Sequence, residues 1–312
     1  MATFWIINVL SYRLVLSTTK NNVTTLTMND PKKLNGWTGP MMLTLRDRFV
    51  QHAQDPDTKV LILTGADPYY CAGVNLSATI QPMHPRKLHE MIRTSNQAVF
   101  DSFLDFPKPI IIAANGPAIG ACVTSASLCD AIVASEKATF VVPFARLSIP
   151  PEGCSSVHFD RMMGAQAAGK MLNDGWKPTA AEALEIGLVK EVVEHEKLLA
   201  RAQELGEQWA REGKKKEIPA GGTVEEYKAV NARESLELAD AFLSYNFLNV
   251  SPSQHSTLSY PLISGPVRVF EEQRKVQPSK RVLHDKNPPA TLVQIVIKRF
   301  QILYQTFPKC CL

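Results

Sequence analysis

The 312-residue sequence lacks the motifs that define several large classes of enzyme. It contains no G-x-x-x-x-G-K-[ST] phosphate loop and no G-x-S-x-G nucleophile elbow. It also contains no H-E-x-x-H zinc helix, because neither His89-Glu90 nor His195-Glu196 is followed by the second histidine. The sequence therefore gives no support for a P-loop, a nucleophile elbow or a zinc-binding helix.

The cysteines show no pattern of a disulfide scaffold or of a metal site. There are only six in the chain, and none of them forms a C-x-x-C pair. Four of them lie among apolar or small residues: Cys71, Cys122, Cys129 and Cys154. That setting favours buried, reduced thiols in an intracellular protein.

Charge and hydropathy give no sign of a partner nucleic acid or of a membrane span. Residues 246–312 carry 9 Lys/Arg against 3 Asp/Glu, whereas residues 1–245 carry 25 against 27. The body of the chain is therefore nearly neutral, and no run alternates basic with aromatic residues as single-strand binders do. The opening MATFWIINVL has no basic n-region and a short apolar run. We therefore expect neither a signal peptide nor a transmembrane segment.

Apolar patterns along the rest of the chain predict an α/β protein with a mostly parallel sheet and helices outside it. Strands are predicted at residues 12–18, 23–28, 59–65, 108–116, 131–135 and 138–143, the first two as a hairpin. Helices are predicted at residues 40–56, 84–104, 118–130, 156–174, 179–187, 196–213 and 224–244.

The pattern divides the chain into three regions. Residues 1–175 form the α/β core, residues 176–245 a helical C-terminal region, and residues 246–312 a basic, proline-rich tail that is expected to be partly disordered. Within the tail, TLVQIVIKRFQILYQTF is apolar and is compatible with a strand, a helix, a disordered segment or a membrane-surface segment.

Two glycine-containing loops follow buried strands. One is YYCAGVNL at residues 69–76, and the other is NGPAIGACVT at residues 115–124, which opens a helix. Glycine lets the backbone approach a ligand closely, and a helix N-terminus presents free N–H groups. Two such loops facing each other could aim two N–H donors at one oxygen, as in an oxyanion hole. The alternative is that these glycines serve the tight packing of strand against helix.

The stretch ARLSIPPEGCSS at residues 145–156 places Glu152 directly after two prolines. Prolines fix φ and lack a backbone donor, so this glutamate is expected in a stiff turn rather than in a helix or a central strand. Apolar walls from Phe144, Ile149 and Cys154 would raise its pKa, as is typical of a catalytic base. The alternative is a loop glutamate without a role. The nearby CSSVHFD is too tightly spaced for a triad, so His158 is predicted to be an ordinary helix residue.

Taken together, CAGVNL, NGPAIGACVTSASLCDAIVAS and PPEGCSS, in this order and spacing, resemble the crotonase (enoyl-CoA hydratase/isomerase) superfamily. They are most similar to its Δ3,Δ2-enoyl-CoA isomerases, and the resemblance runs from residue 12 to residue 244, including NDPKKLNGW and FPKP. It implies a crotonase-type spiral of ββα units with a helical C-terminal region that forms trimers. It further implies conversion of 3-enoyl-CoA to 2-enoyl-CoA in fatty-acid β-oxidation by a homotrimer or hexamer. Neither a metal nor a cofactor is expected beyond the CoA thioester substrate.

The resemblance also implies roles for individual residues. The backbone N–H groups of Val74 and Ala121 would form the oxyanion hole, and Glu152 would be the single base that shuttles a proton. Thr124 and Phe144 stand where hydratases carry their two glutamates, so both hydratase carboxylates are missing. The residues expected to border the acyl-CoA are Lys32, Lys33, Ala72, Gly73, Gly120 and Phe144. The alternative for the two lysines is that they are simply solvated.

Two other functions stay open from the sequence. One is a hydratase or dehydratase of the same superfamily in a secondary-metabolite pathway. The other is a catalytically inactive module that binds acyl-CoA. The compartment also stays open between peroxisome, mitochondrion and cytoplasm, because relatives often end in a Ser-Lys-Leu-like tag whereas this sequence ends in Cys-Cys-Leu.

Overall fold

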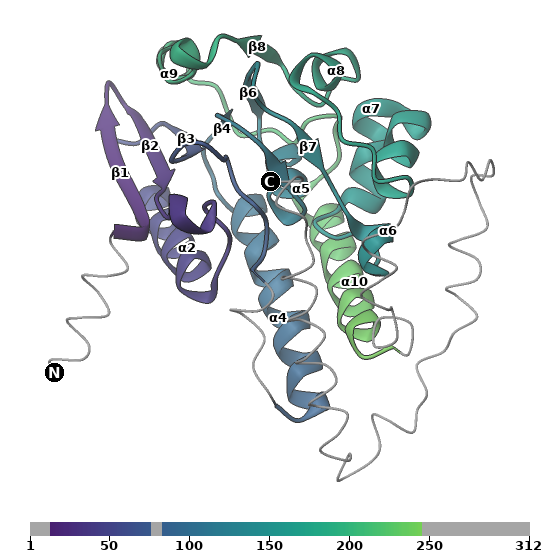
Figure 1. Cartoon of the computed structure of the whole chain (residues 1–312). Helices are drawn as coiled ribbons and strands as arrows, with labels where there is room; N and C mark the ends of the chain where they lie inside the picture. The colour runs from purple at the N-terminus through teal and green to yellow at the C-terminus, as the bar shows by residue number, and fades with distance from the viewer. Residues whose placement is uncertain (1–12, 76–82, 245–312) are drawn as a thin grey trace, which may run out of the picture.

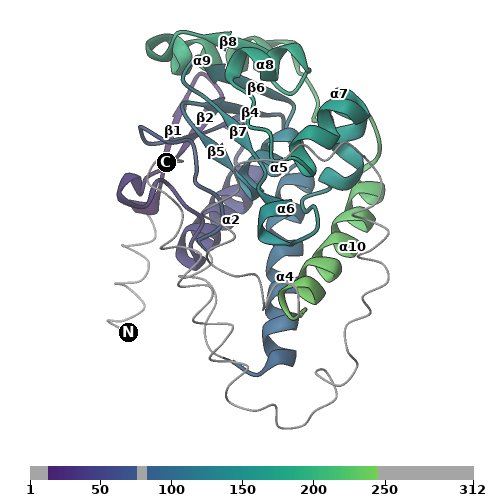
Figure 2. The same ribbon diagram turned by 45° about the vertical axis from the view of Figure 1, so that its right-hand side comes forward.

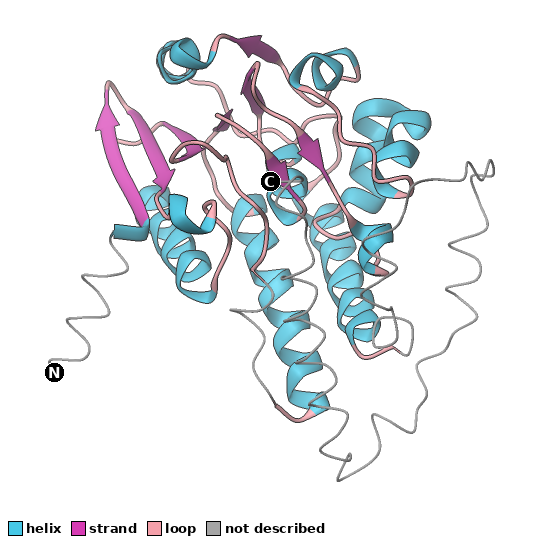
Figure 3. Cartoon of the chain, in the orientation of Figure 1, coloured by secondary structure: helices cyan, strands magenta, loops and turns pink. Residues whose placement is uncertain are grey.

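The computed structural model describes residues 13–75 and 83–244, so the predictions for the basic tail lie outside the described residues. These residues form an α/β fold with two sheets (Figures 1 and 3). The strands are β1 (Val15–Lys20), β2 (Val23–Met28), β3 (Val60–Gly65), β4 (Ile110–Ala114), β5 (Ala118–Ile119), β6 (Ala131–Ser135), β7 (Phe140–Val141) and β8 (Glu191–Val193). The α-helices are α2 (Gly39–Gln54), α4 (Pro85–Leu104), α5 (Ala121–Ser127), α6 (Phe144–Leu147), α7 (Ser155–Leu172), α8 (Ala180–Glu185), α9 (Leu198–Glu212) and α10 (Val224–Phe242). Two short 3-10 helices are η1 (Pro31–Lys33) and η2 (His195–Lys197).

The predicted hairpin is confirmed, but its first strand ends later than the sequence indicated. β1 runs on to Lys20 and pairs antiparallel with β2, leaving only Asn21 and Asn22 in the turn. Both asparagines have positive φ, 51° and 65°. A two-residue turn of this kind needs left-handed residues at both positions, and asparagine tolerates that conformation better than most.

The main sheet has the order β1-β2-β3-β4-β6-β8, and its neighbours from β2 onward are parallel. Its central strands are buried on both faces, as their continuous apolar runs predicted. Along β3, Leu61 and Leu63 pack into the larger core, whereas Ile62 packs on the opposite face against α9 residues such as Leu205 and Trp209. The sheet is therefore a rigid platform whose strand ends can carry functional loops.

The second sheet corrects two sequence predictions. Ala118–Ile119 form β5 rather than the start of a helix, and β5 pairs in parallel with β7, which is shorter than predicted and separate from the main sheet. Gly120 has a φ of 65° and interrupts the backbone between β5 and α5. Strand and helix thus meet at one glycine, and that junction is part of the candidate site.

Two long helices lie side by side below the main sheet in both ribbon views (Figures 1 and 2). They are α4 and α10, and α10 belongs to the predicted helical C-terminal region. One face of α10 is buried at a spacing typical of an amphipathic helix: Tyr227, Asn231, Glu234, Ser235 and Leu238. Three of these five side chains are polar or charged, so this face does more than fill a core. No helix in the described parts of the chain is long and apolar enough to cross a membrane.

Candidate active site

The two glycine loops predicted from the sequence lie against each other. Cys71 forms a parallel bridge with Ala118, and the Ile119 N–H donates to the Cys71 carbonyl oxygen at 3.0 Å. Gly73 has a φ of 79°, and a Cβ atom at this position would collide with the carbonyl oxygen of Ile119. Glycine is therefore required at residue 73 for the close approach of the two loops.

The same contacts do not use the backbone N–H groups of Val74 and Ala121. Val74 pairs with Trp37, but the bonds of this bridge run from Trp37 N to Gly73 O (2.8 Å) and from Asn75 N to Trp37 O (3.0 Å). Ala121 is the first residue of α5 and so has no acceptor within its own helix. Among the described residues, neither amide has an acceptor, so both are available to an oxygen of a ligand.

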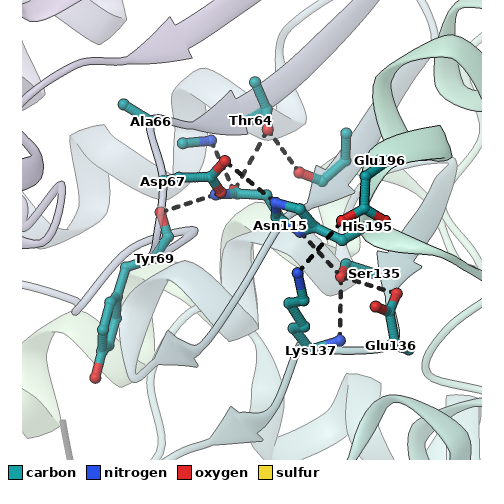
Figure 4. Close-up of polar contacts among 12 residues, drawn as sticks. Thr64, Ala66, Asp67, Tyr69, Asn115, Ser135, Glu136, Lys137, His195 and Glu196 are labelled. Carbon is teal, nitrogen blue, oxygen red and sulfur yellow. Dashed lines mark hydrogen bonds and ion pairs between the residues drawn. The ribbon is translucent and has the colours of Figure 1, made fainter.

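A polar network fastens the loop that leads into Gly73, as Figure 4 shows. Asn115 Nδ2 donates to Asp67 Oδ1 at 2.8 Å and to the Tyr69 carbonyl oxygen at 3.3 Å. His195 lies with Nε2 3.2 Å from Asp67 Oδ2 and Nδ1 3.2 Å from Ser135 Oγ. The network ties this loop to the ends of β4 and β6 and to η2. His195 is thus a structural residue. In residues 13–75 and 83–244, no group of three His, Cys, Asp or Glu side chains is placed to hold a metal ion.

Glu152 occupies the stiff turn that the two prolines predicted. Its side chain is 7% exposed, and Gly153 and Cys154 follow it with φ values of 65° and 67° before α7 begins. A Cβ atom at Gly153 would collide with the Phe100 ring and lie 2.6 Å from Thr124 Oγ1. The turn therefore packs on α5, three residues beyond Ala121. The fold brings Glu152 and the glycine loops, which are distant in sequence, to one region.

The environment of Glu152 suits a group that accepts and releases a proton near neutral pH. Burial raises the pKa of its carboxyl from the ordinary 4.5 to about 7. A hydrogen bond from Asn96 Nδ2 to Glu152 Oε2 opposes this rise, and the charge of Glu234 adds to it. A carboxyl with a pKa near the working pH is the most effective general base.

The sequence motifs gave no indication that Asn96 and Glu234 belong to the candidate site. Asn96 lies on α4 between Ile92 and Phe100, at the spacing of the buried apolar stripe. Glu234 lies on the buried face of α10 and accepts hydrogen bonds from Cys154 N at 2.6 Å and Ser156 N at 3.0 Å. A polar residue within the apolar stripe of α4, and a buried face of α10 that is largely polar, are the signals in the sequence that could have found them.

The remaining residues of the predicted site lie as follows. Lys32 and Lys33 are exposed on η1, where Lys33 Nζ lies 3.5 Å from Asp30 Oδ2. The chain continues from η1 to Leu34, whose carbonyl oxygen accepts a hydrogen bond from Ala72 N at 3.0 Å, so the lysines lie on the segment beside the Gly73 loop. A role of the lysines in binding CoA stays a prediction.

Two other residues lie near the Glu152 turn, Phe144 and His158, and a contact of Phe144 with the acyl-CoA stays a prediction. Phe144 is buried at the start of α6, and its carbonyl oxygen accepts a hydrogen bond from Ile149 N at 3.1 Å. His158 is buried in α7 with Nδ1 2.8 Å from the Tyr227 hydroxyl and Nε2 2.8 Å from the Ser127 carbonyl oxygen. Both of its ring nitrogens are thus engaged, as expected for an ordinary helix residue. The four cysteines of the described chain are free and buried, as predicted.

The comparisons with known proteins place the chain in a family. Residues 18–260 match the model of the enoyl-CoA hydratase/isomerase family, to which this chain therefore belongs. The crystal structure of an enoyl-CoA hydratase/isomerase from Pseudoalteromonas atlantica has the same crotonase fold, with a TM-score of 0.65 and 27% identity over 75% of this chain and 93% of that one.

Two curated relatives carry the name enoyl-CoA delta isomerase. The peroxisomal enoyl-CoA delta isomerase 3 of Mus musculus is 36% identical over 181 residues, which are 57% of this chain and 56% of the relative. Enoyl-CoA delta isomerase 2 of Homo sapiens is 38% identical over 186 residues, 58% of this chain and 46% of the relative. The chain thus spans about half the length of these two relatives.

We expect the pKa of Glu152 to rise further when its hydrogen bond with Asn96 is removed. Asn96→Leu has the same number of side-chain heavy atoms and the same branching at Cγ but cannot donate to the carboxylate, and such a bond contributes about 1.5–3 kcal/mol, or about 1–2 pKa units. The midpoint can be measured by infrared titration of the carboxyl band that disappears in Glu152→Gln. Thr94→Val, at an exposed position on the same helix, is the control and should leave the midpoint unchanged. An unchanged midpoint in Asn96→Leu would show that the bond does not act on Glu152.

Proposed function

We propose that this protein is a Δ3,Δ2-enoyl-CoA isomerase, which moves the double bond of a 3-enoyl-CoA to the 2-position. The observation that carries the proposal is the buried carboxyl of Glu152, with a pKa of about 7, in the turn packed on α5. Thr124 and Phe144, at the positions that correspond to the hydratase glutamates, carry no carboxylate. The names of the two isomerase relatives support the same reaction.

In the proposed mechanism, Glu152 takes a proton from C2 of the bound thioester. The electrons move to the thioester oxygen, and the resulting enolate oxygen accepts hydrogen bonds from the N–H groups of Val74 and Ala121. Return of the same proton from Glu152 to C4 shifts the double bond into conjugation with the carbonyl. The reaction consumes no water and needs no electron acceptor, so one carboxyl group and two amides are sufficient for it.

The ratio of isomerase to hydratase activity tests this assignment. Hydration requires a held and activated water, for which crotonases use two carboxylates, and this site offers neither at Thr124 nor at Phe144. We expect the full-length protein to isomerise 3-enoyl-CoA at least about 10²-fold faster than it hydrates 2-enoyl-CoA, because one missing acid–base group alone costs about 10²–10⁴ in rate. The absorbance of the conjugated thioester, gained in one assay and lost in the other, measures both rates. Equal rates would favour the hydratase alternative.

A binding module without activity is the second alternative, and it is tested with the same protein. Acyl-CoA would raise its melting temperature, but no conjugated product would form in the absorbance assay. Other features implied by the family stay predictions: a homotrimer or hexamer, a role in peroxisomal β-oxidation, and catalysis without a metal or cofactor.

A further inference from the structure

A carboxylate from α10 reaches the turn that carries Glu152. Glu234 is fully buried, and its two oxygens accept hydrogen bonds from one amide of that turn and one amide in the first turn of α7. Cys154 N donates to Oε2 at 2.6 Å, and Ser156 N donates to Oε1 at 3.0 Å. Glu234 therefore caps the N-terminus of α7 from another helix, since Cys154, at the N-cap position, provides no side-chain cap of its own.

The segment that Glu234 binds has an unfavourable backbone conformation. Cys154 has a φ of 67°, in the left-handed region that is unfavourable for a non-glycine residue. Gly153 beside it also has a positive φ, 65°, so two successive residues depart from ordinary conformations directly after Glu152. Such a turn persists only when its surroundings hold it. The two hydrogen bonds to Glu234 provide that hold.

A second contact links α10 with the Glu152 carboxyl itself. Ser235 Oγ donates to Asn96 Oδ1 at 2.8 Å, which orients the amide so that its Nδ2 points to Glu152. Two adjacent residues of α10 therefore act on Glu152. Glu234 binds the backbone that follows it, and Ser235 orients Asn96, which binds its carboxyl. We propose that Glu234 is a positioning residue for the isomerisation, an inference that rests on the proposed function: its carboxylate holds the turn that aims Glu152 at the substrate.

The choice of a carboxylate for this capping role has a second consequence. Burying a charge is costly, and within the described residues Glu234 forms no direct ion pair, whereas the nearby Arg233 pairs with Glu237. Burial raises the pKa of Glu234 to about 7, and its negative charge raises the pKa of Glu152 in turn. The charge thus makes Glu152 a stronger base than a neutral capping residue would.

Other ionisable groups lie at the Glu152 turn. Arg233 on α10 acts on Glu234, Asp101 on α4 acts on Cys154 in the turn, and the backbone N–H of His158 on α7 donates to the Cys154 carbonyl oxygen at 2.8 Å. Burial raises the pKa of the Cys154 thiol and lowers the pKa of His158, so both stay uncharged near neutral pH. Arg233 lowers the pKa of Glu234, and Asp101 Oδ1 accepts a hydrogen bond from Asn231. A substitution of Glu234 therefore changes the charge beside Glu152 without replacing these groups.

The test compares Glu234→Gln with Glu237→Gln, an exposed position on the same helix. We expect Glu234→Gln to lower kcat about 10- to 10²-fold with KM nearly unchanged, because small misplacements of a reacting group cost that much. The acidic limb of kcat/KM should move to lower pH, since removing the negative charge lowers the pKa of Glu152. Glu237→Gln should match wild type in kcat and in the position of the acidic limb. A Glu234→Gln protein would overturn the proposal if it loses only thermal stability, while its kcat and the acidic limb of its kcat/KM profile match wild type.

Two further measurements keep the outcome decisive. If Glu234→Gln does not fold, Glu234→Asp retains the charge but is too short to reach both amides, so kcat should fall while the acidic limb stays in place. Wild-type kcat in the folded aspartate variant would reject the positioning role. Infrared titration of Glu152 in the variants needs no turnover. If the wild-type protein does not isomerise 3-enoyl-CoA, the proposed function fails, whereas an unshifted Glu152 titration in Glu234→Gln contradicts the coupling itself.

Discussion

Replacing Glu152 by glutamine should lower the isomerase kcat about 10³-fold or more, toward the upper part of the range of about 10²–10⁴ for one acid–base group. Glutamine retains the volume and can still accept the hydrogen bond from Asn96, but it cannot take a proton. Neither Thr124 nor Phe144 can replace it as a base. Acyl-CoA affinity, measured by calorimetry, should stay close to wild type. A variant with more than a tenth of the wild-type rate would remove Glu152 from the mechanism.

A second prediction for Glu152→Gln concerns the pH dependence of its melting temperature, which does not depend on activity. Because the pKa of Glu152 is about 7 in the folded protein and near 4.5 when exposed, the folded state binds more protons between these values. The Glu152 contribution to stability therefore falls as pH rises through that window. Glu152→Gln should melt at a higher temperature than wild type at pH 8, where the buried carboxylate is charged. The difference should be smaller at pH 5, where Glu152 is protonated in the folded protein.

The second large effect is expected for Ala121→Pro. Proline lacks the N–H that we assign to the oxyanion hole, and one such donor contributes about 2.7–4 kcal/mol, or about 10²–10³ in kcat. The fold should persist, because Ala121 is the first residue of α5, where proline is well tolerated, and Gly120 before it is not helical. The measurement is kcat together with circular dichroism to confirm folding.

Ala121→Gly is the matched control for this experiment. It retains the N–H and removes only a methyl group, so its kcat should lie much closer to wild type than that of the proline variant. A folded Ala121→Pro protein with full activity would mean that the oxyanion donor lies elsewhere. Equal losses in both variants would mean that the methyl group, rather than the amide, supports catalysis.

Local features of the candidate site could be predicted from the sequence because they depend on neighbouring residues. Pro150 and Pro151 restrict the backbone before Glu152, so a stiff turn follows from two adjacent side chains. The continuous apolar run of β3 predicts burial on both faces, and the structure confirms it. The family resemblance added the expectation that the N–H groups of Val74 and Ala121 form one oxyanion hole, which no local pattern contains.

Sequence alone was less informative where one glycine separates two kinds of structure. Residues 118–130 are small and apolar throughout, which is compatible with a continuous helix. The structure places Ala118–Ile119 in a strand because β7 supplies a partner, and α5 begins only after Gly120. A strand of two residues exists through its pairing, and that pairing is a tertiary contact.

The sequence by itself determined the α/β class, most helices and central strands, and the stiff turn that carries Glu152, because these follow from periodicity and from proline chemistry. Only the tertiary structure decided which groups meet the carboxyl of Glu152. Asn96 is 56 residues away along the chain, and Glu234 reaches an amide 80 residues distant. Helical periodicity shows that both side chains are buried, but not what they are buried against. Their partners depend on how α4, α10 and the Glu152 turn pack together.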